Sequence, residues 1–248
     1  MVAIQYTDHG TAVRVGAAGG ALARAALAAM DAPSMLDTRP WRWRIDGDRA
    51  ALFADRGRWL PDDPDGRLVL LGCGAALHHA EVALAGDGVG VEVRRLPDDG
   101  EPDLVALLHY TGTAARPPRA MRLHRAIALR HSDRRAPTSR PIPGTTVELL
   151  RDAAEAAGGG LWPLGPGATR FAITAATDGP RGWLGAGETL SAVLLNATAE
   201  GLATEVERYL TAAEAGGPAW APVGAGRPAV VVVIAPAGRV GAAKGGRS

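Results

Sequence analysis

The sequence predicts an α+β fold in which one chain contains two related halves. Three observations lead to this prediction. Residues 41–45, WRWRI, alternate large apolar and basic side chains, as a half-buried strand does. Alanine-rich stretches of helical length alternate with such strands along the chain. Two segments, 71–96 and 184–209, also share one pattern of a helix, a glycine and a strand.

Composition narrows the class of protein before any motif is considered. The 248 residues suffice for one large or two small domains, and 47% hydrophobic with 21% charged residues is ordinary for a globular chain. A net charge of +1 argues against a general nucleic-acid surface. The single cysteine, Cys73, is expected to be a small buried residue and favours a reducing cytoplasm. No secretory signal or membrane span is predicted, and the aliphatic run at 229–235 is expected to be a buried strand.

The elements of the first half follow from turns and hydrophobic patterns. The turn residues 46–49 join two short strands, and 62–67 have the composition of a loop. The segment 97–118 is rich in Pro, Gly and Asp, and a short helical piece is expected near Leu104–His109. The predicted regular elements are a helix at 20–30, strands at 41–45 and 51–54, a helix at 74–86 and a strand at 89–96.

The second half begins near Arg122 and repeats this alternation. Within 143–160, Thr145 and Glu148 have the spacing of a capping box, and Gly158 is a plausible end of the helix. The other predicted elements are a helix at 122–130, a strand at 170–175, a helix at 187–202 that ends at Gly201, and a last strand at 229–235.

Residues 71–96 align without gaps on 184–209, and we interpret this as an internal repeat. Chance and shared Ala/Gly bias would give only about two or three identities at ordinary residue usage. The eight identical pairs of the 26 are Leu71/Leu184, Gly72/Gly185, Gly74/Gly187, Leu77/Leu190, Gly88/Gly201, Glu92/Glu205, Val93/Val206 and Arg95/Arg208. A duplicated unit predicts an internal pseudo-dimer.

The densest polar cluster of the sequence is LRHSDRR at 129–135. In an extended conformation Arg130, Ser132 and Arg134 would point to one side, where two guanidiniums and a hydroxyl suit a phosphate. The alternative is a solvated charge run at the end of a helix, where cations also favour the helix dipole. The residues alone leave both interpretations open.

R-x-S-x-R at a helix end resembles the flavin-phosphate motif of the nitroreductase family, and APSMLDTRPW at 32–41 resembles that family's A-P-S-x-x-N-x-Q-P-W segment. In ordinary nitroreductases the arginine motif precedes A-P-S, whereas here the order is reversed. This arrangement resembles the Acg-like branch, in which one chain folds like two fused nitroreductase subunits around FMN. Further similar stretches are 40–77, 126–135 and 185–202. The resemblance implies a mixed sheet with flanking helices, and halves at 1–118 and 119–248.

The resemblance also assigns residues. Arg130, Ser132 and Arg134 would hold the phosphate and ribitol of FMN, and His131 would add a flavin contact. Pro33, Ser34 and Met35 would present backbone groups to the isoalloxazine ring. Because the flavin carries the redox chemistry, no catalytic acid or base is expected of the protein.

The sequence departs from the family pattern at three places. Asp37 replaces an asparagine and Arg39 replaces a glutamine. An ionised Asp37 only accepts hydrogen bonds and would repel an anionic reduced flavin, unless Arg39 pairs with it or faces the flavin itself. The chain is also short for the Acg-like branch, both between 165 and 168 and after Glu207.

Other candidate sites are weaker. His78 and Glu81 offer only two metal ligands, and the adjacent His78 and His79 should diverge on a helix, so no metal site is expected. The prediction is an FMN-binding, cytoplasmic, nitroreductase-like protein, either an NAD(P)H-dependent oxidoreductase of small nitro or quinone acceptors, a non-catalytic flavin-sequestering protein, or a scaffold that has lost FMN. A monomer with an internal two-fold or a homodimer would both fit, with no nucleic-acid or membrane partner.

Overall fold

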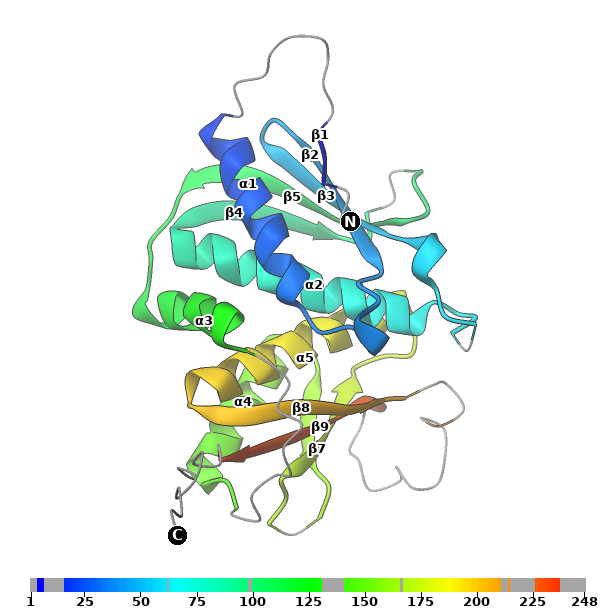
Figure 1. The fold of residues 1–248 in the computed structure, drawn as a ribbon, viewed down its shortest axis with the longest axis vertical. Helices are drawn as coiled ribbons and strands as arrows, with labels where there is room; N and C mark the ends of the chain where they lie inside the picture. The colour runs from blue at the N-terminus through cyan, green and yellow to red at the C-terminus, as the bar shows by residue number, and fades with distance from the viewer. Residues whose placement is uncertain are drawn as a thin grey trace, which may run out of the picture.

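The computed structural model describes residues 4–6, 16–61, 63–97, 100–130, 141–165, 167–210, 214 and 226–236. Within them the fold is α+β, as predicted, with two sheets separated by helices (Figure 1). Two long helices, α2 (Arg67–Asp87) and α5 (Pro180–Ala199), pack against each other between the sheets. There is one main hydrophobic core for each sheet, and both helices contribute residues to both cores.

The first sheet has the order β1-β2-β3-β5-β4, in which β1 runs parallel to β2 and all other neighbours are antiparallel. Its alternation is the predicted one, because Trp41, Trp43 and Ile45 are buried against α1 (Ala17–Ala28) and α2 while the arginines between them lie on the other face. Its strands are β1 (Ile4–Tyr6), β2 (Trp41–Asp46), β3 (Arg49–Ala54), β4 (Val89–Arg95) and β5 (Leu104–Thr113).

The second sheet has the order β6-β7-β9-β8 and is antiparallel throughout, so only the first sheet is mixed. The two parts of the chain share one succession of elements: a helix, two strands, a helix and two strands. The strands also lie in the same order, because β2-β3-β5-β4 in the first sheet corresponds to β6-β7-β9-β8 in the second. The elements here are α4 (Gly144–Ala156), β6 (Gly160–Pro163), β7 (Arg170–Ala175), α5, β8 (Leu202–Tyr209) and β9 (Arg227–Pro236), and α3 (Pro118–Leu129) precedes them.

The two long helices cross at two glycines. A Cβ atom added to Gly74 would overlap the backbone carbonyl of Leu184, and one added to Gly187 would overlap that of Leu71. In the alignment of 71–96 on 184–209, Gly74 matches Gly187 and Leu71 matches Leu184, so the two contacts are reciprocal. Only residues without a side chain allow helix backbones to approach this closely.

Beside this crossing, two histidines share one hydroxyl. His78 Nδ1 lies 2.7 Å from Ser191 Oγ, and His79 Nδ1 lies 2.8 Å from the same atom and 3.0 Å from the carbonyl of Ala75. The prediction that the two rings diverge is therefore wrong, because α5 supplies an oxygen that both can reach. Burial lowers the pKa of His78 to about 4 and of His79 to about 3, so both are neutral near pH 7.

A second polar cluster links the same helices to the edge of the first sheet. Arg95, the last residue of β4, donates from Nε to Glu188 on α5 and from Nη2 to Glu81 on α2, both at 2.8 Å. Burial raises the pKa of both carboxyl groups, to about 7 for Glu81, although Arg95 opposes the shift.

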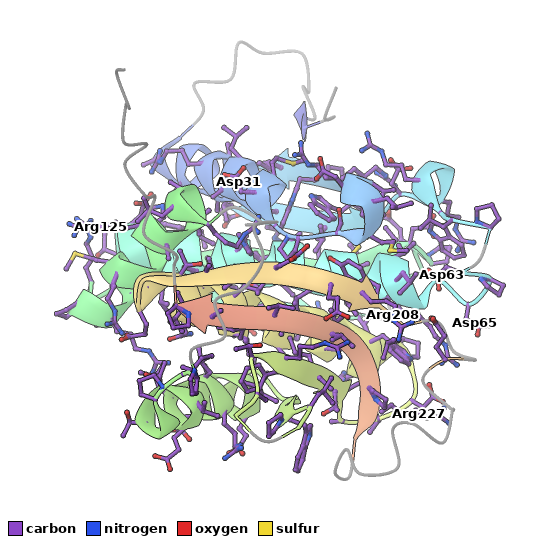
Figure 2. All side chains as sticks on the ribbon, turned by 60° about the horizontal axis from the view of Figure 1, so that its bottom comes forward. Asp31, Asp63, Asp65, Arg125, Arg208 and Arg227 are labelled. Atoms are coloured by element: carbon purple, nitrogen blue, oxygen red, sulfur yellow. The ribbon has the colours of Figure 1, made fainter. Side chains whose placement is uncertain are left out.

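Three local predictions are corrected by the structure. The expected helical piece at Leu104–His109 is part of the strand β5. The helix expected from residue 74 begins at Arg67, because Asp63 accepts hydrogen bonds from the backbone of residues 67–69 at the start of α2 (Figure 2). The expected capping box is absent, since α4 starts after Pro143 with no side-chain cap.

One helix in the described residues, α2, is long and apolar enough to cross a membrane, with a mean hydropathy of 1.6. Because 78% of the most apolar stretch of this helix is buried inside the protein, α2 is accounted for as a core helix.

Candidate functional site

A cavity of about 730 Å³ opens where three parts of the chain meet. One wall is the segment from Met30 to Arg39, another is the end of β8, and Arg130 lies just beyond the end of α3. Its lining residues are Met30, Asp31, Ala32, Pro33, Ser34, Met35, Leu36, Asp37, Arg39, Arg130, Val206, Glu207, Arg208 and Tyr209.

Six of the nine residues that the sequence predicts to bind the cofactor line this cavity. Arg130 lies about a hundred positions from the A-P-S segment along the chain, yet the two share this cavity. The six are Pro33, Ser34, Met35, Asp37, Arg39 and Arg130. The other three, His131, Ser132 and Arg134, lie outside the described residues.

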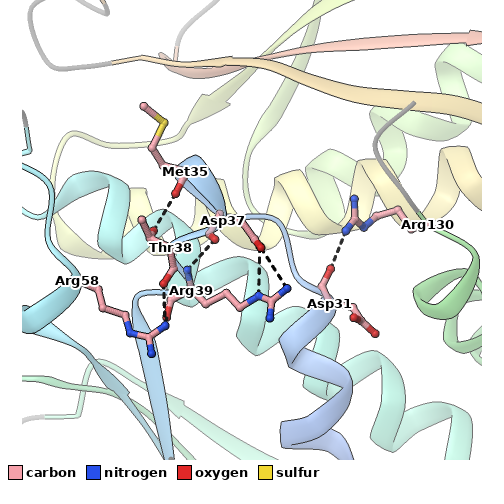
Figure 3. A network of polar contacts seen from close by, with 8 residues as sticks. Asp31, Met35, Asp37, Thr38, Arg39, Arg58 and Arg130 are labelled. Atoms are coloured by element: carbon pink, nitrogen blue, oxygen red, sulfur yellow. Dashed lines mark hydrogen bonds and ion pairs between the residues drawn. The ribbon is translucent and has the colours of Figure 1, made fainter. Parts of the chain in front are cut away.

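The A-P-S segment is folded into a compact turn by its own polar groups. After the short helical turn Ala29–Asp31, the chain forms another at Met35–Asp37. The backbone N–H of Arg39 donates to Ser34 Oγ at 2.9 Å, and Thr38 Oγ1 donates to the carbonyl of Met35 at 2.8 Å (Figure 3). Ser34 and Thr38 therefore close the turn, as their hydroxyls commonly do in loops.

Two contacts fix this turn to the rest of the first half. Arg58 Nη1 donates to the carbonyls of Thr38 at 2.9 Å and Arg39 at 3.3 Å (Figure 3). Pro40 lies over Gly72 of α2, where an added Cβ would come within 3.1 Å of the proline ring. The turn is thus positioned by α2, which also forms the centre of the fold.

The turn contains unusual backbone conformations. Leu36, Asp37 and Arg39 have φ angles of 50°, 54° and 47°, in the left-handed region that favours glycine. The Leu36 side chain is in addition 76% exposed at the cavity wall. Left-handed non-glycine residues cost about 1–3 kcal/mol each and cluster at functional sites, which makes this turn a candidate for one.

Asp37 and Arg39, the two departures from the family pattern, bind each other. Arg39 Nε and Nη2 donate to the two carboxylate oxygens of Asp37 at 3.2 and 3.3 Å (Figure 3). The pairing of Arg39 with Asp37, considered above from the sequence, is confirmed, and it forms within a tight turn. The Asp37 side chain is 72% exposed, so the pair contributes little to stability, but it partly neutralises the carboxylate beside the cavity.

Arg130 stands apart from the other two arginines of the cavity. Arg39 pairs with Asp37 and Arg208 with Glu214, whereas Arg130 donates from Nη2 to the backbone carbonyl of Asp31 at 2.8 Å (Figure 3). Among the described residues, it forms no ion pair, and its buried Nε has no hydrogen-bond partner. Burial lowers the pKa of Arg130, and an arginine still remains charged at neutral pH.

The end of β8 is the part of the site that sequence reasoning missed. Val206, Glu207, Arg208 and Tyr209 all line the cavity, and Arg208 lies towards the end of the strand in Figure 2. Their position depends on the packing of the second sheet against α5, which no local motif reports. The only signal in the sequence is that the repeat extends to Tyr209.

The arrangement provides a polar cavity with one cation, Arg130, that forms no ion pair with a carboxylate of the described residues. Such a cation can bind an anion, and residues 34–37 of the turn line the cavity beside it. Across those same residues, no group of three or more His, Cys, Asp or Glu side chains comes together as a metal site.

No family model matches the chain. The chain is 41% identical over 135 residues to "Putative NAD(P)H nitroreductase Rv3131" of Mycobacterium tuberculosis, a match that covers 54% of this chain and 38% of that protein. It is 41% identical over 81 residues to "Putative NAD(P)H nitroreductase acg" of the same organism, which covers 32% of this chain and 24% of the relative. A third relative, "Uncharacterized protein Rv3127", is 32% identical over 144 residues, or 40% of its own length. The chain thus spans about two fifths or less of these relatives, and its similarity to the two proteins named as nitroreductases is confined to the matched part.

Proposed function

We propose that the chain binds FMN in the cavity between residues 30–39, Arg130 and the end of β8. We further propose that it acts there as an NAD(P)H-dependent oxidoreductase of small nitro or quinone acceptors. The main support for the proposal is that Arg130 and the A-P-S turn line the same cavity. The resemblance to nitroreductases assigns these two parts of the chain to opposite ends of one flavin. The partial similarity to nitroreductases supports the same activity.

The residues present fit a flavin phosphate. Arg130 has a buried Nε–H without a partner among the described residues, which is what a site missing an anionic ligand would leave. The cavity volume of about 730 Å³ lies within the roughly 300–1,000 Å³ typical of cofactor and small-molecule sites.

The chain's own residues would then bind and orient. Arg130 would hold the phosphate, and its fixed bond to the carbonyl of Asp31 keeps the guanidinium in place before binding. The turn closed by Ser34 and Thr38 would present its backbone to the ring. FMN, when bound, supplies the hydride and electron transfer, so the protein needs no acid or base of its own.

We also propose that the halves 1–118 and 119–248 are related by an internal two-fold axis. The reciprocal contacts of Gly74 and Gly187 support this, as does the repeated succession of helices and strands with one order in both sheets. On this proposal a monomer already contains what two nitroreductase subunits would supply, and a homodimer is not needed to complete the cavity. A cytoplasmic location fits the nicotinamide donor.

A non-catalytic, flavin-sequestering role is the second candidate, and one observation favours it. Asp37 lines the cavity with a carboxylate where the resemblance expects an amide. A negative charge next to the ring opposes the anionic reduced flavin and so disfavours turnover, while leaving the oxidised flavin bound.

The visible spectrum of the purified protein, with and without added FMN, tests binding first. Bound flavin that NADH or NADPH bleaches under anaerobic conditions supports the enzyme, whereas bound flavin that resists both supports sequestration. A colourless protein that takes up no FMN refutes the site and leaves a scaffold that has lost its cofactor.

The matched variants are Arg130→Ala and Arg125→Ala. Arg125 lies on α3, the helix that Arg130 directly follows, and has an exposed side chain (Figure 2). Loss of Arg130 should weaken FMN binding by about 2 kcal/mol, or roughly thirtyfold, because a charge-assisted bond to phosphate is lost. Loss of Arg125 should leave it unchanged, and equal effects of both would show that Arg130 is only a surface charge.

A further inference from the structure

Tyr209 is a buried tyrosine at the wall of the cavity. It is the last residue of β8, only 9% exposed, and its ring belongs to the hydrophobic core of the second sheet. The same residue lines the cavity together with Arg130. The ring is thus held by the core while the residue reaches the site.

The Tyr209 hydroxyl forms no hydrogen bond within the part of the chain that the structure describes, and its oxygen is not among the fully buried polar atoms that lack a partner, so the hydroxyl keeps some exposure while the ring is buried. Burial raises the pKa of Tyr209, the nearby Arg130 lowers it and Asp37 raises it, so that the phenol stays protonated and can donate. The cavity is therefore lined by two residues that can each offer a hydrogen to a ligand, Tyr209 with its O–H and Arg130 with a buried Nε–H that has no partner among the described residues.

The chemistry of these two donors selects the ligand. A guanidinium only donates hydrogen bonds, and a neutral phenol can donate one hydrogen, so an anion with several acceptor oxygens can accept from both residues at once. A phosphate monoester has three acceptor oxygens and the opposite charge to Arg130. A neutral ring edge lacks the negative charge, and an amine lacks the acceptor oxygens.

We propose that Tyr209 is a second phosphate-binding residue of this site, donating its hydroxyl hydrogen to the phosphate that Arg130 binds. The inference rests on the proposed binding of FMN and deepens it. It assigns to β8, an element without a recognisable motif, a direct role in distinguishing FMN from flavins that lack the phosphate.

The test compares dissociation constants for FMN and riboflavin, measured by quenching of flavin fluorescence. Tyr209→Phe removes one hydroxyl and retains the ring in the core. It should weaken FMN binding roughly tenfold, as expected for one hydrogen bond to a charged group, and leave riboflavin binding unchanged. Tyr110→Phe, on β5 of the first sheet, is the matched control and should change neither constant.

The folding of the variant is checked by its thermal midpoint without flavin. Because the hydroxyl lacks a partner in the described structure, Tyr209→Phe should unfold at the same or a higher temperature than the natural protein. If FMN binds the natural protein and Tyr209→Phe changes both flavins equally, or neither, the inference is wrong while the proposed function stands. If the natural protein binds neither flavin, the proposed function fails and the inference fails with it.

Discussion

Glu81→Gln should change how the stability of the protein depends on pH. The Glu81 side chain is only 24% exposed and binds Arg95, which also binds Glu188. Two carboxylates around one guanidinium leave one negative charge in excess in a buried place. Burial accordingly raises the pKa of Glu81 from its usual 4.5 to about 7, so the carboxyl holds a proton more tightly in the folded protein.

The direction and size of the effect follow from this difference. Below pH 4.5 the group is protonated in both the folded and unfolded chain and contributes no pH dependence. As the pH rises from 4.5 through about 7, the unfolded chain loses the proton first, and the free energy of unfolding falls. The pKa difference corresponds to about 3 kcal/mol in total. Glutamine cannot ionise, so the variant does not incur this loss.

Urea denaturation at pH 5, 6, 7 and 8 measures the effect as the difference between the variant and the natural protein. His78 and His79 have lowered pKa values and make stability rise with pH below 6.5, but they are common to both proteins and cancel. The free energy of unfolding of Glu81→Gln, relative to that of the natural protein, should rise by about 2–3 kcal/mol between pH 5 and 8, because a small part of the effect has already occurred at pH 5. Glu92→Gln, at an exposed position of β4, is the control for the loss of one carboxylate. A flat difference for Glu81→Gln would refute the reasoning.

Three further predictions concern the crossing and the turn. Gly74→Ala and Gly187→Ala should each lower the free energy of unfolding in urea by about 2 kcal/mol or more, because the new Cβ meets backbone, whereas Gly185→Ala meets open space and should not destabilise. Asp37→Asn should lower the free energy of unfolding by less than about 1 kcal/mol, because the pair with Arg39 is exposed. The same variant should bind reduced FMN more tightly in an anaerobic titration, and unchanged affinity would show that Asp37 is not part of the site. Leu36→Gly should raise the unfolding free energy by about 1 kcal/mol, since φ is 50° there, and a lower thermal midpoint would contradict the strain.

The elements that could be predicted are those whose two faces differ. WRWRI alternates because one face of β2 covers the core and the other does not, so its pattern identifies a strand. β5 was misassigned because it is a central strand with both faces largely covered, and the run from Leu104 to Leu108 shows no alternation. A short continuous apolar run fits a buried strand as well as a helix.

The start of α2 was missed for a different reason. DDPDGR has the composition of a loop, and that is correct up to Gly66, which has a left-handed backbone. The function of Asp63 as a cap depends on this sharp turn, which brings its carboxylate to the N–H groups of residues 67–69. Composition alone does not show where such a turn ends.

Some residues of the candidate site could likewise be predicted from the sequence, and others could not. The A-P-S segment and Arg130 could be named from motifs, because a resemblance carries over residue by residue along the chain. Tyr209 has no motif and reaches the cavity only through the packing of β8 against β9 and α5. The strain at Leu36 and Asp37 is likewise a property of the closed turn and is invisible in the letters.

The close crossing of α2 and α5 has a consequence for synthesis on the ribosome. Roughly 110 residues lie between the ends of the two helices, so at about 5–20 residues per second α2 waits roughly 5–20 s for the helix that covers it. During that time the face of α2 that contacts α5 is uncovered, on a helix long and apolar enough to cross a membrane. Nascent chains stalled before residue 180 should therefore associate with chaperones or membranes, and chains released after residue 199 should not.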